Sequence, residues 1–307
     1  MPNLLNHHTI HAPAKINLHL SVKDRRTDGF HDLESIFLAL DWGDELFFER
    51  SKNGDKVFLE WDDTIKPAHI QNNIVSRAIA LFREKSAGSA KAVGAFDGGV
   101  TVHVKKRIPV GGGLGGGSSD AAAALLAMNK LTGSQFCRDE LLAMGAALGS
   151  DVPFFLHETA AAWVTGRGEN IEPIEAPVLP GLVLVNPGFS SDTAAAFRLL
   201  DEYRESKEFT ARRHDPSIRC LGPDLWFKGN DLTFYNDFLP VFGEREKSVY
   251  YEIISDLKDS GAVFADLSGA GATCFGVFDT MEQTQRAAFA LRAKWDFVQC
   301  CSIKSDS

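Results

Sequence analysis

The chain of 307 residues is long enough for two ordinary domains. Its hydrophobic fraction of 44% and charged fraction of 24% are those of a globular protein, which excludes a disordered or fibrous chain. A net charge of −9 argues against nucleic acid as a partner, because phosphate backbones bind to basic surfaces. The sequence has neither a bilayer-spanning apolar stretch nor a secretion signal, and its five cysteines lack CxxC spacing. We therefore expect a cytoplasmic protein without a membrane partner, disulfide framework or structural zinc.

The beginning of the chain is expected to form strands. Residues 14–22 alternate apolar and polar side chains, which predicts a strand with one solvated face. Residues 35–40 and 45–49 are predicted as two further strands. Turn-forming residues at 28–29 and 42–44 predict that the chain reverses between these strands.

Helices and strands are both expected in the rest of the chain. The apolar stripe of Ile74, Ala78 and Leu81 is typical of an amphipathic helix. Residues 204–230 are charged and irregular, which predicts a long surface loop. The predicted helices cover residues 73–82, 120–131, 138–148, 193–203, 249–257 and 281–294, and the predicted strands cover residues 99–105, 182–185 and 273–278.

The segment from Pro109 to Ser119 holds six glycines in eleven residues. Such a run costs conformational entropy and is tolerated where a backbone must curl tightly or approach another group closely. Successive amide groups in such a loop form a concave anion site, and a helix that begins at Ser119 or Asp120 adds its partial positive charge. Cations at residues 105–107 lie directly upstream. These features together predict a site for a polyphosphate.

Known nucleotide-binding motifs account poorly for this loop. A Walker A loop requires lysine where Ser118 stands. Glycines at 111, 113 and 116 satisfy GxGxxG, but any glycine run does, and the preceding alternating strand does not suit a dinucleotide fold. The sequence also lacks the His-Arg-Asp and Asp-Phe-Gly motifs of protein kinases. A flexible linker is disfavoured because an alanine- and leucine-rich helix follows at once.

The loop resembles the phosphate-binding motif of the GHMP kinases, which phosphorylate small hydroxylated metabolites. Four further segments resemble the same family in the same order: residues 12–18, 28–31, 148–153 and 268–272. The doubled glycine block resembles in particular the branch in non-mevalonate isoprenoid synthesis that acts on a cytidine diphosphate-linked methylerythritol.

This resemblance implies an α+β fold with two domains. Residues 1–165 would form an ATP-binding domain like ribosomal protein S5 domain 2, and residues 166–307 a ferredoxin-like domain. The active site would lie between them and transfer the γ-phosphoryl group of ATP, with Mg²⁺, to the 2-hydroxyl group of the methylerythritol moiety. We expect a monomer or a weak homodimer.

The resemblance also assigns two catalytic residues. Asp151 matches the family's catalytic base, although an aspartate at this position would also suit a helix N-cap. Lys15 matches the catalytic lysine, which would stabilise charge beside Asp151, although composition alone favours a lysine on the solvated face of a strand.

The remaining site residues are binding residues by resemblance. Phe30 stands where many relatives carry tyrosine, so its ring stacks without a hydroxyl, and Phe197 is either a second stacking residue or a core aromatic. The sequence does not choose between Ser118 and Ser119 as the contact to metal or phosphate, and the metal ligands stay unknown. The expected ATP contacts are Asn73, Lys105, Pro109, Val110, Gly111, Gly112, Gly113, Leu114, Gly115, Gly116, Gly117, Ser118 and Ser119, and the expected acceptor contacts are Asn17, Phe30, His31, Thr193 and Phe197.

Two other functions remain open at this stage. One is a GHMP kinase for mevalonate, homoserine or a sugar, against which the doubled glycine block and residues 28–31 argue. The other is a nucleotide sensor without catalysis, against which the presence of both Lys15 and Asp151 argues.

Overall fold

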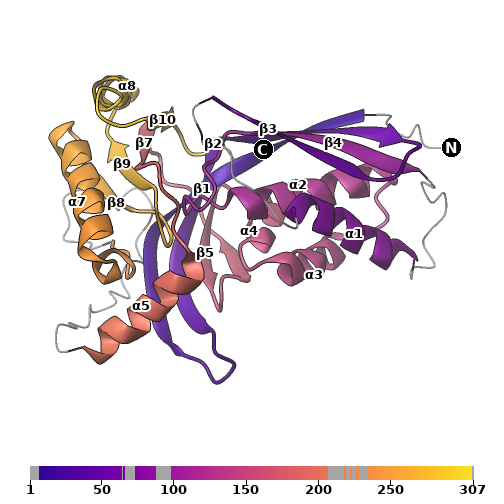
Figure 1. Ribbon diagram of the computed structural model, residues 1–307, viewed down its shortest axis with the longest axis horizontal. Helices are drawn as coiled ribbons and strands as arrows, with labels where there is room; N and C mark the ends of the chain where they lie inside the picture. Colours follow the sequence, from indigo (N-terminus) through magenta and orange to yellow (C-terminus); the bar gives the residue numbers. More distant parts are fainter. Residues whose placement is uncertain are drawn as a thin grey trace.

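The computed structural model describes residues 7–63, 65, 73–87, 98–206, 218, 222, 226–227 and 234–305. The molecule is elongated and has two halves, each built on a sheet (Figure 1). The long antiparallel strands β1 (His7–Arg25) and β2 (His31–Ser51) run from one half towards the other. These two strands therefore contribute side chains to the cores of both halves.

The first half is a six-stranded sheet with helices on one face (Figure 1). Strand β2 lies at its centre, because it pairs with β1 along its length and with β4 and β5 at its two ends. The other strands are β3 (Lys56–Trp61), β4 (Gly99–Lys106), β5 (Ala161–Thr165) and β6 (Asn170–Pro173), and the helices are α1 (Ile74–Ala87), α2 (Gly116–Leu131), α3 (Arg138–Leu148) and α4 (Val152–His157). The alanine-rich α2 packs between sheet and outer helices, because its small side chains allow close approach on all sides.

The second half is a four-stranded antiparallel sheet with the strand order β10-β7-β9-β8. This order, with helices between the strands, is the predicted ferredoxin-like arrangement, and it confirms the α+β class. Its strands are β7 (Gly181–Asn186), β8 (Phe264–Leu267), β9 (Cys274–Phe278) and β10 (Phe297–Cys301), and its helices are α5 (Thr193–Glu205), α7 (Glu244–Asp259), α8 (Met281–Leu291) and the short 3₁₀ helix Leu239–Val241. An apolar cluster that includes Ile16, Leu184 and Phe275 joins the two sheets.

Two predictions for the first strands are wrong. Residues 14–22 have no solvated face, since Lys15, Asn17 and His19 are all buried. The residues 42–44 form no turn but lie inside the continuous strand β2. Gly43 is glycine because a Cβ there would come within 2.1 Å of the carbonyl oxygen of Ala12 on the paired strand.

The helices differ from prediction mainly at their ends. Helix α2 begins at Gly116 rather than at residue 119 or 120, so the last part of the glycine run is its first turn. Helix α1 buries Val75, Ala78, Ile79 and Phe82, so only Ala78 of the predicted stripe is fully buried.

The remaining predictions concern the domain boundary, the loop at residues 204–230 and the membrane. Strand β6 still belongs to the first sheet, so the chain leaves that sheet only after Pro173; the domain boundary at residue 165 stays a prediction. The predicted loop at 204–230 lies mostly outside the described residues. Among the described helices, none is both long and apolar enough to cross a bilayer.

Candidate active site

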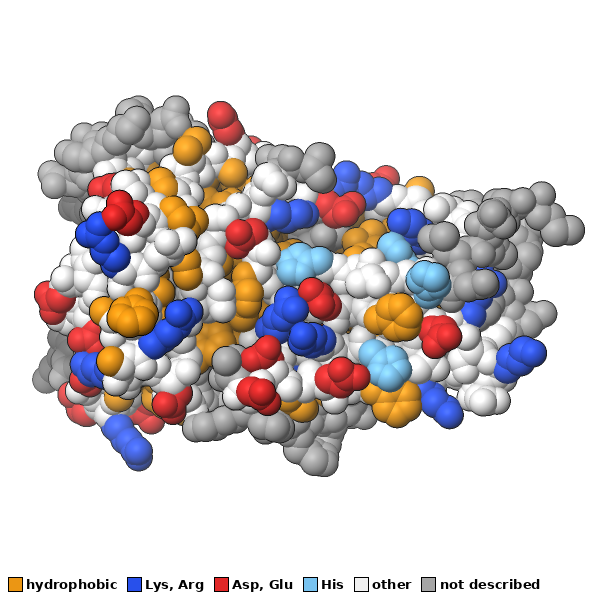
Figure 2. Space-filling model, turned by 90° about the horizontal axis from the view of Figure 1, so that it is seen from above, with side chains coloured by type: hydrophobic (Ala, Val, Ile, Leu, Met, Phe, Trp, Pro, Cys, Tyr) orange, Lys and Arg blue, Asp and Glu red, His pale blue; other side chains and the backbone are white. Residues whose placement is uncertain are grey.

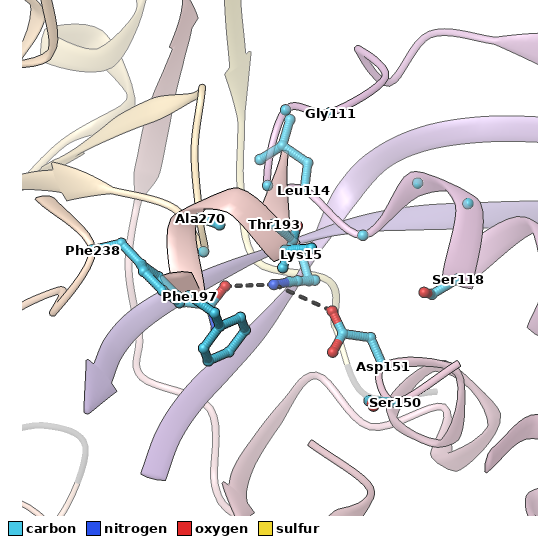
Figure 3. A pocket seen from close by; sticks show the side chains of 18 of the residues that line it. Lys15, Gly111, Leu114, Ser118, Ser150, Asp151, Thr193, Phe197, Phe238 and Ala270 are labelled. Carbon is cyan, nitrogen blue, oxygen red and sulfur yellow. Dashed lines mark hydrogen bonds and ion pairs between the residues drawn. The ribbon is translucent and has the colours of Figure 1, made fainter. Parts of the chain in front are cut away.

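A cavity of about 870 Å³ lies where the two halves meet. Its wall comes from β1, the glycine loop, the start of α2, the turn before α4 and the N-terminal half of α5 (Figure 3). All the predicted site residues line it except Lys105 and Ser119. Segments that are far apart in the sequence therefore converge on one space.

Lys15 and Asp151 meet near the middle of this cavity. The Lys15 Nζ atom lies 3.5 Å from Asp151 Oδ2, and the two side chains point towards each other (Figure 3). Nζ also donates to Asn17 Oδ1 and lies 4.4 Å above the ring of Phe37. Burial lowers the pKa of Lys15, and the neighbouring Asp151 opposes this shift. The lysine is therefore a desolvated cation rather than the solvated lysine that composition favours.

Asp151 stands at the N-cap position of α4, in agreement with the alternative interpretation of the sequence. Its side chain, however, makes no capping hydrogen bond. Its carboxylate instead faces Lys15 and is 31% exposed within the cavity. Gly168 passes close by, and a Cβ there would lie 3.3 Å from Asp151 Oδ1. The carboxylate is thus available for chemistry.

The glycine loop turns one set of backbone groups away from the cavity. The carbonyl oxygen of Gly111 accepts from the amides of Ser191 and Ala272, and that of Gly112 accepts from the amide of Thr273. The carbonyl oxygen of Gly113 accepts from Ser268 Oγ, and that of Leu114 accepts from the amide of Lys15. Gly111, Gly113 and Gly115 have positive φ angles of 67°, 73° and 70°, which glycine adopts without strain. A Cβ on Gly113 would come within 2.1 Å of the carbonyl oxygen of Ser268. The second glycine cluster, 268–272, therefore packs against the first and fixes its shape.

The loop leads directly into the N-terminus of α2. The first amide groups of a helix have no acceptor within the helix and carry partial positive charge. Ser118 lines the cavity in this first turn, whereas Ser119 is buried beneath it. Asn73 also lines the cavity, but its Oδ1 accepts from the amide of Val75 at the start of α1.

The expectation for Lys105 finds no support in the geometry. Side chains of a strand alternate between faces, so Lys105 is exposed on the sheet face opposite the helices while Lys106 is buried and reaches the cavity. The view onto the upper side of the molecule shows acidic, basic and histidine side chains intermingled (Figure 2). Lys106 itself pairs with Asp44 and Asp120. The basic run at 105–107 is therefore no free cation cluster.

Aromatic residues occupy the other end of the cavity. Phe30 is 53% exposed, and the guanidinium of Arg167 lies 4.8 Å from the centre of its ring. The rings of His31 and Phe197 stack at 5.1 Å. His31 Nε2 lies 2.8 Å from Asp201 Oδ1. Phe197 lines the cavity and also packs on the second core, so its packing role is observed and its stacking on a base stays a prediction.

Two polar residues connect the ends of the cavity. Asn17 donates from Nδ2 to Ser35 Oγ at 2.9 Å, which orients its amide beside Lys15. Thr193 opens α5 and is exposed to the cavity, while Asp192 caps the helix through the amides of residues 194 and 195.

Several cavity residues were not predicted from the sequence. Asp201 lies one helical turn after Phe197, and this i, i+4 spacing was the available signal. Arg25, Arg167 and Arg198 line the same end, but isolated arginines gave no local signal. Asp120 also lines the cavity, whereas Asp44 lies outside the lining; both are buried acids whose role depends on contacts distant in sequence.

Comparison with known proteins identifies the family. The model of the GHMP kinases N-terminal domain matches residues 73–159, and that of the GHMP kinases C-terminal domain matches residues 230–296. The chain is similar to proteins named 4-diphosphocytidyl-2-C-methyl-D-erythritol kinase from Chlorobium limicola (35% identity, 91% of each chain) and Thermodesulfovibrio yellowstonii (36%, 94% of this chain and 95% of the relative). A crystal structure of 4-(cytidine 5'-diphospho)-2C-methyl-D-erythritol kinase superposes with a TM-score of 0.77 at 30% identity, over 97% of this chain and 100% of the other. The chain therefore belongs to the GHMP kinase family and is a small-molecule kinase with that family's two-domain fold.

Proposed function

We propose that this kinase transfers the γ-phosphoryl group of ATP to the 2-hydroxyl group of 4-diphosphocytidyl-2-C-methyl-D-erythritol. The names of full-length relatives support this acceptor. The observation that carries the proposal is the position of the Lys15–Asp151 pair, which lies in one cavity between the glycine loop and the aromatic end. The proposed donor site and the proposed base-binding site would thus lie on opposite sides of the proposed proton acceptor.

The glycine loop suits the phosphates of ATP. The carbonyl groups of residues 111–114 are engaged by other segments, and the amide of Gly112 donates to the Pro109 carbonyl within the loop. The amides of the other loop glycines are the groups that would meet an anion. The N-terminus of α2 adds partial positive charge at the same place. Asn73 and the first two residues of the loop, Pro109 and Val110, also line the cavity and would contact the nucleoside.

The aromatic end suits cytosine. A carboxylate only accepts hydrogen bonds, so His31 Nε2 donates to Asp201, and the tautomer with this proton has an acceptor at Nδ1. An acceptor fits the exocyclic amino group of cytosine and repels the corresponding carbonyl oxygen of uracil. Arg167 covers one face of Phe30, which leaves the other face for stacking on a base.

The proposed reaction needs one proton acceptor and one cation. Asp151 takes the proton of the 2-hydroxyl group as that oxygen bonds to the γ-phosphorus. The bond from the γ-phosphorus to the β,γ-bridging oxygen breaks, and ADP leaves with the electron pair. Lys15 stabilises the negative charge near the reacting oxygens in a site from which water is partly excluded.

Mg²⁺ would neutralise phosphate charge when bound. The Ser118 hydroxyl fits this ion, because it faces the cavity and offers an oxygen ligand, while Asp151 is the proposed proton acceptor. Within the described residues, no group of three or more His, Cys, Asp and Glu side chains could hold a metal ion. Such a site suits an ion that keeps most of its water ligands.

An acceptor panel tests the proposal. Purified enzyme is supplied with ATP and Mg²⁺, and ADP release is followed with 4-diphosphocytidyl-2-C-methyl-D-erythritol, mevalonate, homoserine or galactose. We expect ADP release that depends on the cytidyl acceptor. Release that appears only with another acceptor would assign a different GHMP kinase activity, and tight ATP binding without transfer to any acceptor would indicate a nucleotide sensor.

A further inference from the structure

Three buried charged residues lie at the base of the glycine loop. Lys106 stands three residues before Pro109, and Asp120 follows the loop in the first turns of α2. Asp44 comes from the neighbouring strand β2 and is completely buried. The side chains of Lys106 and Asp120 are also almost fully buried, at 4% and 6% exposed. This cluster, here termed the loop clip, brackets the loop on both sides.

The contacts of the loop clip join three elements. Lys106 Nζ donates to Asp120 Oδ2 at 2.6 Å and also to Asp44 Oδ2. Asp44 Oδ1 accepts from the backbone amides of Arg107 and Ile108 at 2.5 and 2.9 Å. The chain that enters the loop and the helix that leaves it are therefore tied to each other and to β2.

The charges in the loop clip do not balance. Two carboxylates share one ammonium group in an environment that excludes water. Burial raises the pKa of Asp120 to about 7, while Lys106 counteracts this shift. Buried ion groups of this kind are weak sources of stability compared with apolar packing. Their position around the loop therefore indicates a role other than filling the core.

The loop clip can influence the cavity through the backbone amides of the glycine loop. The amides proposed to meet the phosphates belong to residues between the two ends that the loop clip joins, and their directions would change if either end shifted. The second glycine cluster holds the middle of the loop through the carbonyl groups of residues 111–113. The loop clip holds the two ends, so the two sets of contacts are complementary.

We infer that Asp44, Lys106 and Asp120 are positioning residues that preset the glycine loop for the phosphates of the donor nucleotide. This inference rests on the proposed role of the loop in binding ATP, but not on the identity of the acceptor. None of the three residues is required to touch the reacting atoms. Their loss should weaken nucleotide binding more than acceptor binding.

Nucleotide affinity of single variants tests the inference. Asp120→Asn keeps the shape of the side chain and one acceptor for Lys106. Asp44→Asn also keeps the shape, but its single acceptor serves either Lys106 or the amides of Arg107 and Ile108. We expect the Kd for Mg-ATP, measured by calorimetry without acceptor, to rise about tenfold in each, as supporting residues do around other preorganised sites. The KM for the acceptor should change less than twofold, and Asp120→Glu should restore part of the affinity because it restores the charge.

Arg107→Met provides the matched control. Arg107 is the neighbouring cation, and it pairs at the surface with Glu45 at 3.2 Å. Its loss should leave the Kd for ATP unchanged if the effect belongs to the loop clip rather than to local positive charge. Lys106→Met leaves two buried acids without a cation, so its melting temperature is measured first.

Two results would overturn the inference. One is a fall in melting temperature in the Asp44 and Asp120 variants with an unchanged Kd for ATP, which would make the loop clip purely structural. The other is a loss of ATP binding in Lys106→Arg that far exceeds the loss in both aspartate variants, which would make Lys106 a direct ligand. Because ATP binding is measured alone, neither result depends on which acceptor the enzyme uses.

Discussion

Replacing Asp151 by asparagine keeps the shape of the side chain but removes its charge and its capacity to take a proton. Its carboxylate caps no amide of α4, so the loss should fall on catalysis more than on the fold. A positioned general base contributes about 10²–10⁴-fold to rate. We therefore expect kcat to fall by about that factor, which corresponds to about 3–5 kcal/mol in activation free energy.

The same substitution changes the state of Lys15. At the observed 3.5 Å, and with an effective dielectric constant of about 20, two unit charges attract by about 5 kcal/mol. This value is an upper bound because Asp151 is 31% exposed and water screens it. Burial already lowers the pKa of Lys15, and Asp151 is the group that opposes this. In the variant the pKa of Lys15 should therefore fall further.

The assay combines steady-state kinetics with two controls. Binding of the acceptor by calorimetry and the melting temperature show whether the variant keeps its fold. Asp279→Asn, at an exposed site outside the cavity lining, is the matched substitution and should leave kcat unchanged. A folded Asp151→Asn enzyme that binds both substrates and keeps kcat within about threefold of the original would refute the role of Asp151 as general base.

Four further predictions follow from the geometry. Burial lowers the pKa of Lys15 below 10.5, so its ammonium group loses a proton at lower pH than that of an ordinary lysine. In a pH–rate profile, kcat/KM should therefore begin to fall below pH 10.5 on the alkaline side. Lys15→Arg should remove this alkaline fall. The asparagine in Asp201→Asn can either accept from or donate to His31, so it no longer fixes the tautomer of the ring. This variant should raise the KM for the cytidyl acceptor by about tenfold and weaken the preference for cytidine over a uridine analogue. Its KM for ATP should stay unchanged. Gly113→Ala should raise the KM for ATP, because the added Cβ would lie 2.1 Å from the carbonyl oxygen of Ser268. Gly54→Ala is the control: Gly54 has a φ of 77° and open space around it, so the variant adds backbone strain alone and should leave the KM for ATP unchanged. Burial raises the pKa of Asp120 from 3.8 to about 7. The stability linked to this group is therefore complete at low pH and is lost as pH rises through 7. Urea unfolding should show that the original chain gains stability relative to Asp120→Asn as pH falls from about 8 to about 5.

Motifs with several chemically constrained residues allowed the central part of the site to be predicted from sequence. Lys15 and Asp151 were assigned from separate segments, and the fold brings them within 3.5 Å. The glycine loop was predictable because a run of six glycines is costly in a folded chain unless its backbone must curl or meet a ligand. Its helix start was predicted too late, since serines after a glycine run are typical of an N-cap, whereas the helix already includes Gly116.

Features that depend on contacts between distant segments were not predictable from local patterns. An alternating strand looks the same whether its polar face meets solvent or a cavity, so the burial of Lys15 and Asn17 was missed. Gly43 resembled a turn residue, but its lack of a side chain serves the close pairing of β1 and β2. A shift of one residue decides which of Lys105 and Lys106 reaches the loop, and only the register of β4 determines it.

The identity of the phosphorylated product tests the proposed reaction most directly. Enzyme, ATP, Mg²⁺ and 4-diphosphocytidyl-2-C-methyl-D-erythritol are incubated, and the product is analysed by ³¹P and ¹³C NMR. We predict one new phosphomonoester attached to carbon 2 of the methylerythritol moiety, formed in proportion to ADP and absent with Asp151→Asn over the same time. A phosphate on another hydroxyl group, or ADP formed with inorganic phosphate and no new ester, would contradict the proposed reaction.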